Sequence, residues 1–370
     1  MYIVKAERHI VKKRVALIYG GISGEHSISC LTAASVMRAI DSNAYEVVPI
    51  AIAQDGTWVL GKTDPDDVEK HEVTVSDNKI SLECGPNPGF HILHDDGTTT
   101  PLGHIDVAFP LVHGSFGEDG TLQGALEMMG IPYVGCGVFA SAAGMDKHFM
   151  KIVLESAGLP VAPYVVADTR SWARRREEVL AEVEEKLTYP VYVKPARAGS
   201  SLGISRVAGS EALVEAVEVA HKVDPKVIIE QGIKGRELEC AVLGGHGLDA
   251  PRTSVLGEIV LEAQWYDYDT KYKDTDGFYM SIPAVIPEED SDTMRRMAAQ
   301  LFEAFDCEGM TRADFFYTEN REIYVNEHNT VPGFTSVSMY PILWDKTGIP
   351  YRELITELIS LALERGVGLR

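Results

Sequence analysis

The chain has 370 residues, of which 45% are hydrophobic and 24% charged, and these proportions are typical of a folded globular protein. Its formal net charge of −21 at pH 7 argues against non-specific binding to nucleic acid or to an anionic membrane surface. A single hydrophobic core rarely serves so long a chain, so we expect two or three domains. No run of residues approaches the roughly 20 apolar positions of a membrane span, and the first residues lack the apolar core of a signal peptide.

The cysteines are odd in number and far apart, and no two of them have the spacing of a metal-binding pair. Because disulfides are rare in reducing compartments, this usage predicts free thiols in a cytoplasmic protein. The five are Cys30, Cys84, Cys136, Cys240 and Cys307.

The first part of the chain, residues 1–146, is predicted to be an α/β domain with a parallel sheet. Short apolar runs indicate buried parallel strands, and apolar residues at helical spacing indicate the helices between them. We expect strands at 14–19, 45–53, 107–112 and 132–134, and helices at 29–40 and 122–129. Residues 61–104 are polar and punctuated by glycine and proline, so we interpret them as an excursion with one or two hairpins.

Two α+β domains are predicted to follow, at residues 147–233 and 234–370. For the first we expect helices at 147–154 and 174–186 and strands at 164–167, 191–194 and 227–231. For the second we expect strands at 237–243, 254–261 and within 313–329, then a helix at 351–364. The predicted class is therefore mixed α/β and α+β, with three domains.

A glycine-rich stretch, residues 20–24, lies between the first strand and the first helix. Backbone amides at a helix N-terminus suit an anion, although a tight strand–helix turn explains the glycines equally well. The stretch is not a dinucleotide-binding fingerprint, and no acidic residue closes the second strand. Glu25 follows the glycines, where its carboxylate could meet a substrate ammonium group.

The loop after Lys194 has the composition of a flexible phosphate-binding flap. Small residues at 195–203 permit close backbone approach to phosphates, and Ser200 and Ser201 add hydroxyl donors. The alternative is an exposed turn. Lys147, at the start of a helix, could bracket a polyphosphate together with Lys194, although a lone lysine is usually just solvated.

A polar break follows the strand at 227–231. Such a hinge can offer backbone groups to adenine and the apolar side chain of Ile233 to the face of the ring. Glu237, a few residues further on, could hold the ribose hydroxyls. The alternative is an inter-domain linker with exposed acids.

The strongest pattern is a pair of alternating strands joined by a turn at residues 320–321. That turn pairs Asp314 with Glu327, and alternation puts Glu327 and Asn329 on one face. Two carboxylates and an amide oxygen form an all-oxygen site suited to Mg²⁺ that also takes phosphate oxygens. Ordinary polar residues of an edge strand are the alternative, but such groups are costly among apolar neighbours without a partner.

Three further features lie near this pattern in the sequence. Arg312 precedes the first candidate ligand by two residues, close to where an oxyanion would develop. Residues 266–272 form a polar aromatic loop suited to be a lid. Residues 332–338 supply backbone and hydroxyl donors that can hold a carboxylate.

Together these features resemble the ATP-grasp superfamily and, within it, the D-alanine–D-alanine ligase family. The resemblance covers residues 15–363 and rests on six motifs in the family's order. They are GGISGEHSIS at 20–29, HGSFGEDGTLQG at 113–124, MDK at 145–147, VKPARAGSSLG at 193–203, YDYDTKY at 266–272 and NEHNTVPGFTS at 326–336. The resemblance implies a three-domain ATP-grasp fold, a homodimer and a cytoplasmic ligase that makes D-alanyl-D-alanine for peptidoglycan precursors.

The resemblance also implies which residues bind the substrates. The ATP-binding set would be Lys147, Lys194, Ser200, Ser201, Glu230, Gln231, Gly232, Ile233, Glu237 and Lys271. Two Mg²⁺ ions, with Mn²⁺ as a substitute, would be held by Asp314, Glu327 and Asn329. D-alanine would contact Glu25, His113, Ser338 and Met339.

For catalysis, the resemblance assigns oxyanion stabilisation to Arg312 and the backbone amide of Gly333. Ser200 and Tyr272 would bond with Glu25 and close the lid over an acyl phosphate, which excludes water.

Two departures from the family pattern bear on the substrates. Ala198 stands where several relatives have an acid, and Met339 stands where leucine is common, which affects the shape of the second-substrate pocket. Tyr272 favours an amine acceptor, because relatives that make D-alanyl-D-lactate change this tyrosine. The alternatives are a sister ligase that uses D-lactate or D-serine, a nucleotide-binding regulatory protein on the same fold, and, from the first βαβ unit alone, an NAD oxidoreductase.

Overall fold

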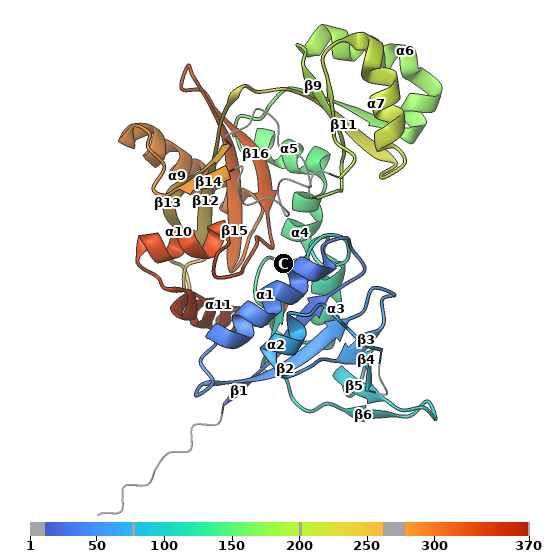
Figure 1. Ribbon diagram of the computed structural model, residues 1–370, viewed down its shortest axis with the longest axis vertical. Helices are drawn as coiled ribbons and strands as arrows, with labels where there is room; N and C mark the ends of the chain where they lie inside the picture. Colours follow the sequence, from blue (N-terminus) through green and yellow to red (C-terminus); the bar gives the residue numbers. More distant parts are fainter. Residues whose placement is uncertain (1–11, 76–77, 200–201, 262–277, 369–370) are drawn as a thin grey trace, which may run out of the picture.

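A computed structural model describes residues 12–75, 78–199, 202–261 and 278–368. These residues form three β-sheets that follow one another along the chain and occupy different parts of the molecule (Figure 1). The candidate residues Ser200, Ser201, Lys271 and Tyr272 lie outside the described residues.

The N-terminal sheet has seven strands in the order β6-β5-β4-β3-β2-β1-β7. Its parallel part consists of β1 (Lys13–Gly20), β2 (Tyr45–Ile52) and β7 (Val107–Pro110), and α1 (His26–Ala39) connects the first two. The predicted βαβ unit is thus confirmed. The strand predicted at 132–134 is reduced to a single bridge at Tyr133, and α3 (Thr121–Met129) precedes it.

Residues 61–104 contain the antiparallel pairs β4–β5 and β5–β6, in agreement with the predicted hairpins, and these strands extend the N-terminal sheet on one side. Four antiparallel strands continue it from β2, and the short helix α2 (Pro65–Val68) packs against α1. The strands are β3 (Trp58–Leu60), β4 (Lys79–Glu83), β5 (Gly89–Leu93) and β6 (Thr99–Pro101).

The middle sheet is antiparallel, in the order β10-β9-β11-β8, and carries the helices seen at the upper right of Figure 1. Its strands are β8 (Tyr164–Asp168), β9 (Val191–Pro195), β10 (Ser205–Val207) and β11 (Lys226–Gln231). Its helices are α6 (Thr169–Lys186) and α7 (Leu213–Ala220), with a 3₁₀ turn at Ser210–Ala212.

The C-terminal sheet has the order β14-β13-β12-β15-β16. Its strands are β12 (Gly235–Leu243), β13 (Arg252–Leu261), β14 (Phe278–Ser281), β15 (Met310–Thr318) and β16 (Ile323–Asn329). The associated helices are α4 (Val138–Met145), α5 (Lys147–Ser156), α9 (Glu288–Ala304), α10 (Met339–Thr347) and α11 (Tyr351–Arg365). The sequence analysis did not predict α4, α7, α9, α10 or β14.

The pairing of Asp314 with Glu327 is confirmed, although the turn differs from the predicted one. β15 and β16 are joined by four residues, 319–322, rather than by a two-residue loop. Between Asp314 and Phe315 the register shifts by one residue. This irregularity restores the predicted pairing at the site end of the strands.

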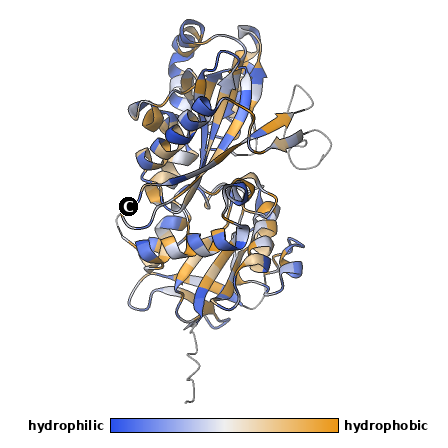
Figure 2. Cartoon of the chain, turned by 90° about the vertical axis from the view of Figure 1, so that its left-hand side faces the viewer, coloured by the Kyte–Doolittle hydropathy of each residue, from blue (hydrophilic) through white to orange (hydrophobic). Residues whose placement is uncertain are grey.

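The buried residues divide the molecule differently from the sheets. One core joins the N-terminal sheet to α10 and α11, and a second joins α4 and α5 to the C-terminal sheet. A third lies on the other face of the N-terminal sheet, and a fourth belongs to the middle sheet alone. In Figure 2 hydrophobic residues gather on the strands and hydrophilic ones on the outer helix faces. The N- and C-terminal sheets are therefore coupled by packing, whereas the middle sheet has its own core.

Candidate active site

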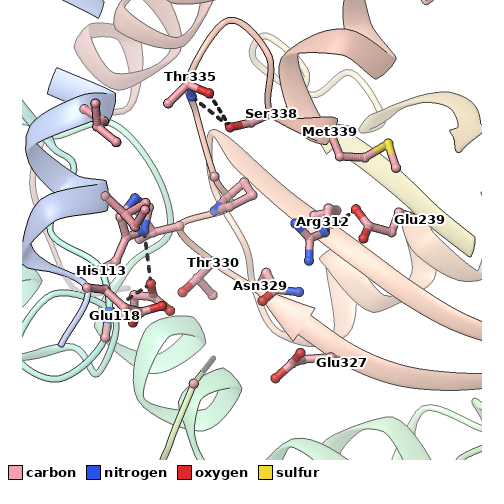
Figure 3. A pocket seen from close by; sticks show the side chains of 18 of the residues that line it. His113, Glu118, Glu239, Arg312, Glu327, Asn329, Thr330, Thr335, Ser338 and Met339 are labelled. Atoms are coloured by element: carbon pink, nitrogen blue, oxygen red, sulfur yellow. Dashed lines mark hydrogen bonds and ion pairs between the residues drawn. The ribbon is translucent and has the colours of Figure 1, made fainter. Parts of the chain in front are cut away.

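A cavity of about 620 Å³ opens between the N-terminal sheet, the C-terminal sheet and the loop that follows β9. Figure 3 shows side chains from several of these elements pointing into it. The predicted site residues that line it are Glu25, His113, Lys147, Arg312, Glu327, Asn329, Gly333, Ser338 and Met339.

Glu25 lies at the start of α1, between two glycines from different loops. A Cβ atom on Gly114 would lie 2.8 Å from Oε2 of Glu25, and one on Gly199 would lie 3.6 Å from the same oxygen. The glycines thus let both loops approach the carboxylate closely. Ser23 fixes the loop before Glu25, because its hydroxyl donates to the backbone oxygen of His113 at 2.7 Å.

His113 is buried and lies beside Glu118, a residue to which the sequence analysis assigned no role (Figure 3). Nδ1 of His113 is 3.4 Å from Oε1 of Glu118, which also accepts a hydrogen bond from the backbone N–H of Gly114 at 3.0 Å. Burial alone lowers the pKa of His113, but the hydrogen bond and charge of Glu118 outweigh it and the pKa is raised. Burial raises the pKa of Glu118, and His113 offsets part of this effect.

Lys147 is the first residue of α5, and its position is fixed on both sides. Its backbone N–H donates to the carbonyl of Ala196 at 2.9 Å, and its ammonium group donates to the carbonyl of Ala198 at 3.0 Å. The ammonium group also lies 3.2 Å from Oε1 of Glu327. Lys147 therefore links the loop after β9 to the candidate metal strand.

Lys194 does not line the cavity but belongs to a buried cluster next to it. Its ammonium group lies 2.6 Å from Glu230, which is also 2.5 Å from the ammonium group of Lys151. Burial raises the pKa of Glu230, but the two ammonium groups outweigh it and lower the pKa to about 2. The pKa of Lys194 is raised, because the charge of Glu230 outweighs the effect of burial.

Arg312 connects two strands of the C-terminal sheet through carboxylates. Its guanidinium group donates to both oxygens of Asp314 at 2.7 Å and lies 2.9 Å from Glu239 on β12. Burial lowers the pKa of Arg312, but Asp314 and Glu239 outweigh it and the pKa is raised. Arg312 is thus held as a charged group at the cavity wall.

The candidate metal ligands lie together at one end of the β15–β16 pair. Asp314 is directly opposite Glu327, and the side-chain amide of Asn329 donates to Asp314 at 2.9 Å. Glu327 and Asn329 line the cavity, and Asp314 lies directly beside them, so two carboxylates and an amide oxygen form a group that suits a hard cation. The residues present therefore fit Mg²⁺.

The loop after β16 supplies further donors to the cavity. The hydroxyl of Ser338 lies 2.7 Å from that of Thr335 and accepts the backbone N–H of Thr335 at 3.1 Å (Figure 3). A Cβ atom on Gly333 would lie 3.3 Å from the same hydroxyl. Met339 is only 5% exposed, and its sulfur packs against Gly257 of β13. The side chain of Met339 therefore shapes this end of the cavity.

The predicted adenine hinge lies outside the cavity lining. Gln231 ends β11 and its side-chain oxygen accepts the backbone N–H of Thr188 at 3.0 Å, while the N–H of Gly232 donates to Pro190 at 2.9 Å. Ile233 lies in the short connection before β12, and Glu237 lies on β12.

Three residues of the site region were not assigned a role from the sequence: Glu118, Lys151 and Glu239. Lys151 follows Lys147 by four residues on one helix, a spacing that puts both on the same face. This helical spacing was the feature of the sequence that could have identified Lys151. Glu239 is two residues beyond Glu237 and on the same face of its strand, but only pairing of β12 with β15 brings it to Arg312.

Comparison with known proteins agrees with this arrangement. The D-ala D-ala ligase N-terminus model matches residues 14–136, and the D-ala D-ala ligase C-terminus model matches residues 153–360. A D-alanine–D-alanine ligase of Paenarthrobacter aurescens is 50% identical over 97% of both chains.

Solved structures give the same result. The D-Ala:D-Ser ligase VanG of Enterococcus faecalis has a TM-score of 0.84 and 34% identity, covering 95% of this chain and 100% of its own. The D-alanine–D-alanine ligase of Coxiella burnetii has a TM-score of 0.80 and 32% identity, covering 96% of this chain and 94% of its own. The fold is therefore that of the ATP-grasp ligases. The chain belongs to the D-alanine–D-alanine ligase family. Among the described residues, no helix is both long and apolar enough to span a membrane.

Proposed function

We propose that the chain uses ATP to join two D-alanine molecules into D-alanyl-D-alanine, with release of ADP and phosphate, and so supplies peptidoglycan precursor synthesis. The cavity is the observation that carries this proposal. It brings a carboxylate and an imidazole from the N-terminal matched region together with a guanidinium group from the C-terminal one and the ammonium group of Lys147, which lies between the two. Such a set can bind zwitterionic amino acids and a polyphosphate at once.

The first step forms D-alanyl phosphate. A carboxylate oxygen of the first D-alanine attacks the γ-phosphorus of ATP, the bond from that phosphorus to the bridging oxygen breaks, and ADP leaves. Glu25 pairs with the ammonium group of this D-alanine, with His113 close by. Lys147 and Lys194 hold phosphate oxygens through charge-assisted hydrogen bonds, each typically contributing about 1.5–3 kcal/mol.

Asp314, Glu327 and Asn329 are the residues that would hold Mg²⁺, or Mn²⁺ in its place. When bound, the metal would neutralise negative charge on the phosphoryl group that is transferred. Two features support this assignment: the direct pairing of Asp314 with Glu327, and the contact of Asn329 with Asp314.

In the second step, the amine of the second D-alanine attacks the acyl carbon. The carbon–oxygen bond to phosphate breaks, phosphate leaves, and the nitrogen loses a proton as the peptide bond forms. Arg312 and the backbone amide of Gly333 stabilise the oxyanion that develops. Ser338 holds the carboxylate of this second molecule, and Met339 borders its pocket.

Closure of the site rests on residues of two loops. Ser200 and Tyr272 bond with Glu25 over the acyl phosphate and exclude water. The contact of Glu25 with Gly199, the residue before Ser200, supports this assignment. Tyr272 also favours an amine over a hydroxyl acceptor.

The remaining assignments concern ATP and the whole molecule. Adenine and ribose are bound by the segment from Glu230 through Gln231 and Gly232 to Ile233, and by Glu237, while Ser201 and Lys271 contact phosphates. The protein is a cytoplasmic homodimer with domains at 1–146, 147–233 and 234–370.

The test is turnover of the purified chain with ATP and Mg²⁺, with products identified by mass. D-alanine alone should give equal amounts of ADP, phosphate and dipeptide, whereas L-alanine should give almost none. Mixtures of D-alanine with D-lactate or D-serine test the acceptor. A main product containing D-lactate or D-serine would identify a sister ligase, and ATP binding without any product would refute ligase activity.

A further inference from the structure

Behind the candidate active site, three buried side chains bring two thiols and an imidazole together. Cys136 precedes α4, Cys307 follows α9 and His328 lies on β16; they are 2%, 7% and 3% exposed. Their ligand atoms all lie within 4.8 Å of one another. In the part of the chain that the structure describes, no other group of three histidine, cysteine or acidic residues meets this condition.

The spacing of these atoms fits a tetrahedral cation. The sulfur of Cys307 and Nε2 of His328 are 3.3 Å apart. In a tetrahedral site with Zn–S of about 2.3 Å and Zn–N of about 2.0 Å, a sulfur and a nitrogen ligand lie roughly 3.5 Å apart. Thiolates and imidazole also select Zn²⁺ over Mg²⁺, which prefers oxygen ligands.

The cluster lies on the opposite face of β16 from the candidate magnesium ligands. His328 is between Glu327 and Asn329 in the strand, and alternation directs its side chain away from theirs. The imidazole packs so closely against α4 that a Cβ atom on Gly144 would lie 2.8 Å from Nδ1. Gly144 and His328 both line the cavity, so the cluster lies next to it.

We propose that Cys136, Cys307 and His328 form a Zn²⁺ site distinct from the magnesium site. Three protein ligands leave one tetrahedral position for water. Because Cys136 is far in sequence from Cys307 and His328, a bound ion would cross-link the segment before α4 to the C-terminal sheet. Binding releases the thiol protons and stabilises the folded chain in proportion to ion concentration.

The competing explanation is a hydrogen-bonded core cluster. The thiol of Cys136 donates to the carbonyl of Met310 at 3.3 Å, and Cys307 hydrogen-bonds to His328, so both thiols have a partner without a cation, although Nδ1 of His328 has none. The two explanations differ in whether the sulfur atoms of Cys136 and Cys307 coordinate a metal ion.

Cobalt titration of the full chain distinguishes them. Bound metals are first removed from the protein. Excess Mg²⁺ and ATP are then added to occupy the candidate magnesium site, and Co²⁺ is titrated in. We expect a thiolate-to-cobalt charge-transfer band that saturates at one equivalent and is removed by Zn²⁺. Cys136→Ala and Cys307→Ala should each abolish the band. Cys240→Ala is the matched control, because Cys240 is fully buried in the same core, and it should retain the band.

A second measurement needs no variant. X-ray absorption of the Zn²⁺-loaded wild-type chain should show two sulfur neighbours and at least one nitrogen neighbour. A shell of oxygen and nitrogen alone, or no charge-transfer band in the wild-type chain, would overturn the proposal in favour of the hydrogen-bonded cluster. A band that survives both substitutions would overturn it as well.

Discussion

Arg312 holds two carboxylates at once, Asp314 at 2.7 Å and Glu239 at 2.9 Å, while it faces the cavity. Replacement by alanine would remove the positive charge that pairs with both acids, so Arg312→Lys is the better test. Lysine keeps the charge but loses the planar fork. We expect kcat/KM for D-alanine to fall by about 10²–10³, the usual effect of losing an oxyanion donor, with a small change in Tm.

The matched control for this substitution is Arg236→Lys. Arg236 makes the same two-pronged contact with Glu258, both bonds at 2.7 Å, but does not line the cavity. It should keep kcat/KM within about twofold, because Arg236 lies outside the cavity. Equal losses of activity in both variants would mean that Arg312 acts only by supporting the sheet.

The contact between His113 and Glu118 predicts a pH dependence of D-alanine binding. Glu118 raises the pKa of His113 despite burial, so His113 stays charged to a higher pH than an ordinary histidine. Glu118→Gln removes the main effect that opposes burial and so lowers the pKa of His113. The charge is lost as pH rises through the pKa, so KM for D-alanine should begin to increase at a lower pH in the variant.

The measurement is KM for D-alanine across neutral pH, together with the imidazole resonance of His113. Glu83→Gln is the control, because Glu83 lies 3.9 Å from buried His91 in β5, which does not line the cavity. Coincident profiles for Glu118→Gln and wild type would show that His113 binds the substrate without its charge.

The ion pair between Lys151 and Glu230 predicts that the stability of the fold depends on pH. The folded-state pKa of Glu230, about 2, is below its ordinary value, so its pairing stabilises the fold above about pH 4.5. That contribution is lost as pH falls toward 2. Lys151→Met should therefore lower the free energy of unfolding by about 1–3 kcal/mol at neutral pH, and the deficit should shrink in acid.

Thermal unfolding between neutral pH and about pH 3 tests this expectation. Lys186→Met, which removes an exposed pair with Glu182 on α6, should change Tm very little at any pH. A deficit for Lys151→Met that stays constant into acid would indicate lost packing rather than a lost charge pair.

At the scale of the element, the start of α5 couples helix capping to nucleotide binding. Asp146 caps α5 by accepting the N–H groups of His148 and Phe149, and Lys147 comes next. Asp168 caps α6 in the same way but lies away from the cavity. Asp168→Ala should cost about 1 kcal/mol of stability, and Asp146→Ala should cost more, because Asp146 is buried and also pairs with Lys226 at 2.6 Å. Only Asp146→Ala should raise KM for ATP, and an equal increase in both would refute the coupling.

Local patterns explain how much of the fold could be predicted from the sequence. Alternating or continuous apolar runs predicted β1, β2, β9, β11 and the pairing of Asp314 with Glu327, because those signals depend on neighbours in sequence. The helix α4 was missed because its small residues are apolar on nearly every face. The turn between β15 and β16 was placed correctly but its length was not, since the shift beside Asp314 leaves no local signature.

Contacts between distant residues could not be predicted in this way. Cys136 and Cys307 are far apart in sequence and show no paired spacing, so only the fold brings them to His328. Pairing of β12 with β15 likewise brings Glu239 to Arg312. In contrast, nine of the predicted site residues line one cavity. Several of them lie on or beside elements that the local pattern had located, such as α1, α5, β15 and β16, whereas Ser338 and Met339 begin α10, which was not predicted.

At the scale of the whole molecule, the cores predict two cooperative units. Val107 belongs to the core that joins the N-terminal sheet to α10 and α11, whereas Val227 belongs to the core of the middle sheet alone. Both are fully buried, so truncation to alanine should cost each core roughly 2 kcal/mol. Native-state hydrogen exchange should then separate the two.

We expect Val227→Ala to accelerate exchange in β8, β9 and β11 and to leave the other sheets unchanged. Val107→Ala should accelerate exchange in the N-terminal sheet and in α10 and α11 together, because they share its core. Saturating ATP should slow exchange in the middle sheet of the Val227→Ala chain, since the nucleotide is proposed to bind between that sheet and the C-terminal one. If Val227→Ala instead accelerates exchange throughout the molecule, the chain unfolds as a single unit. The core of the middle sheet would then not unfold independently of the others.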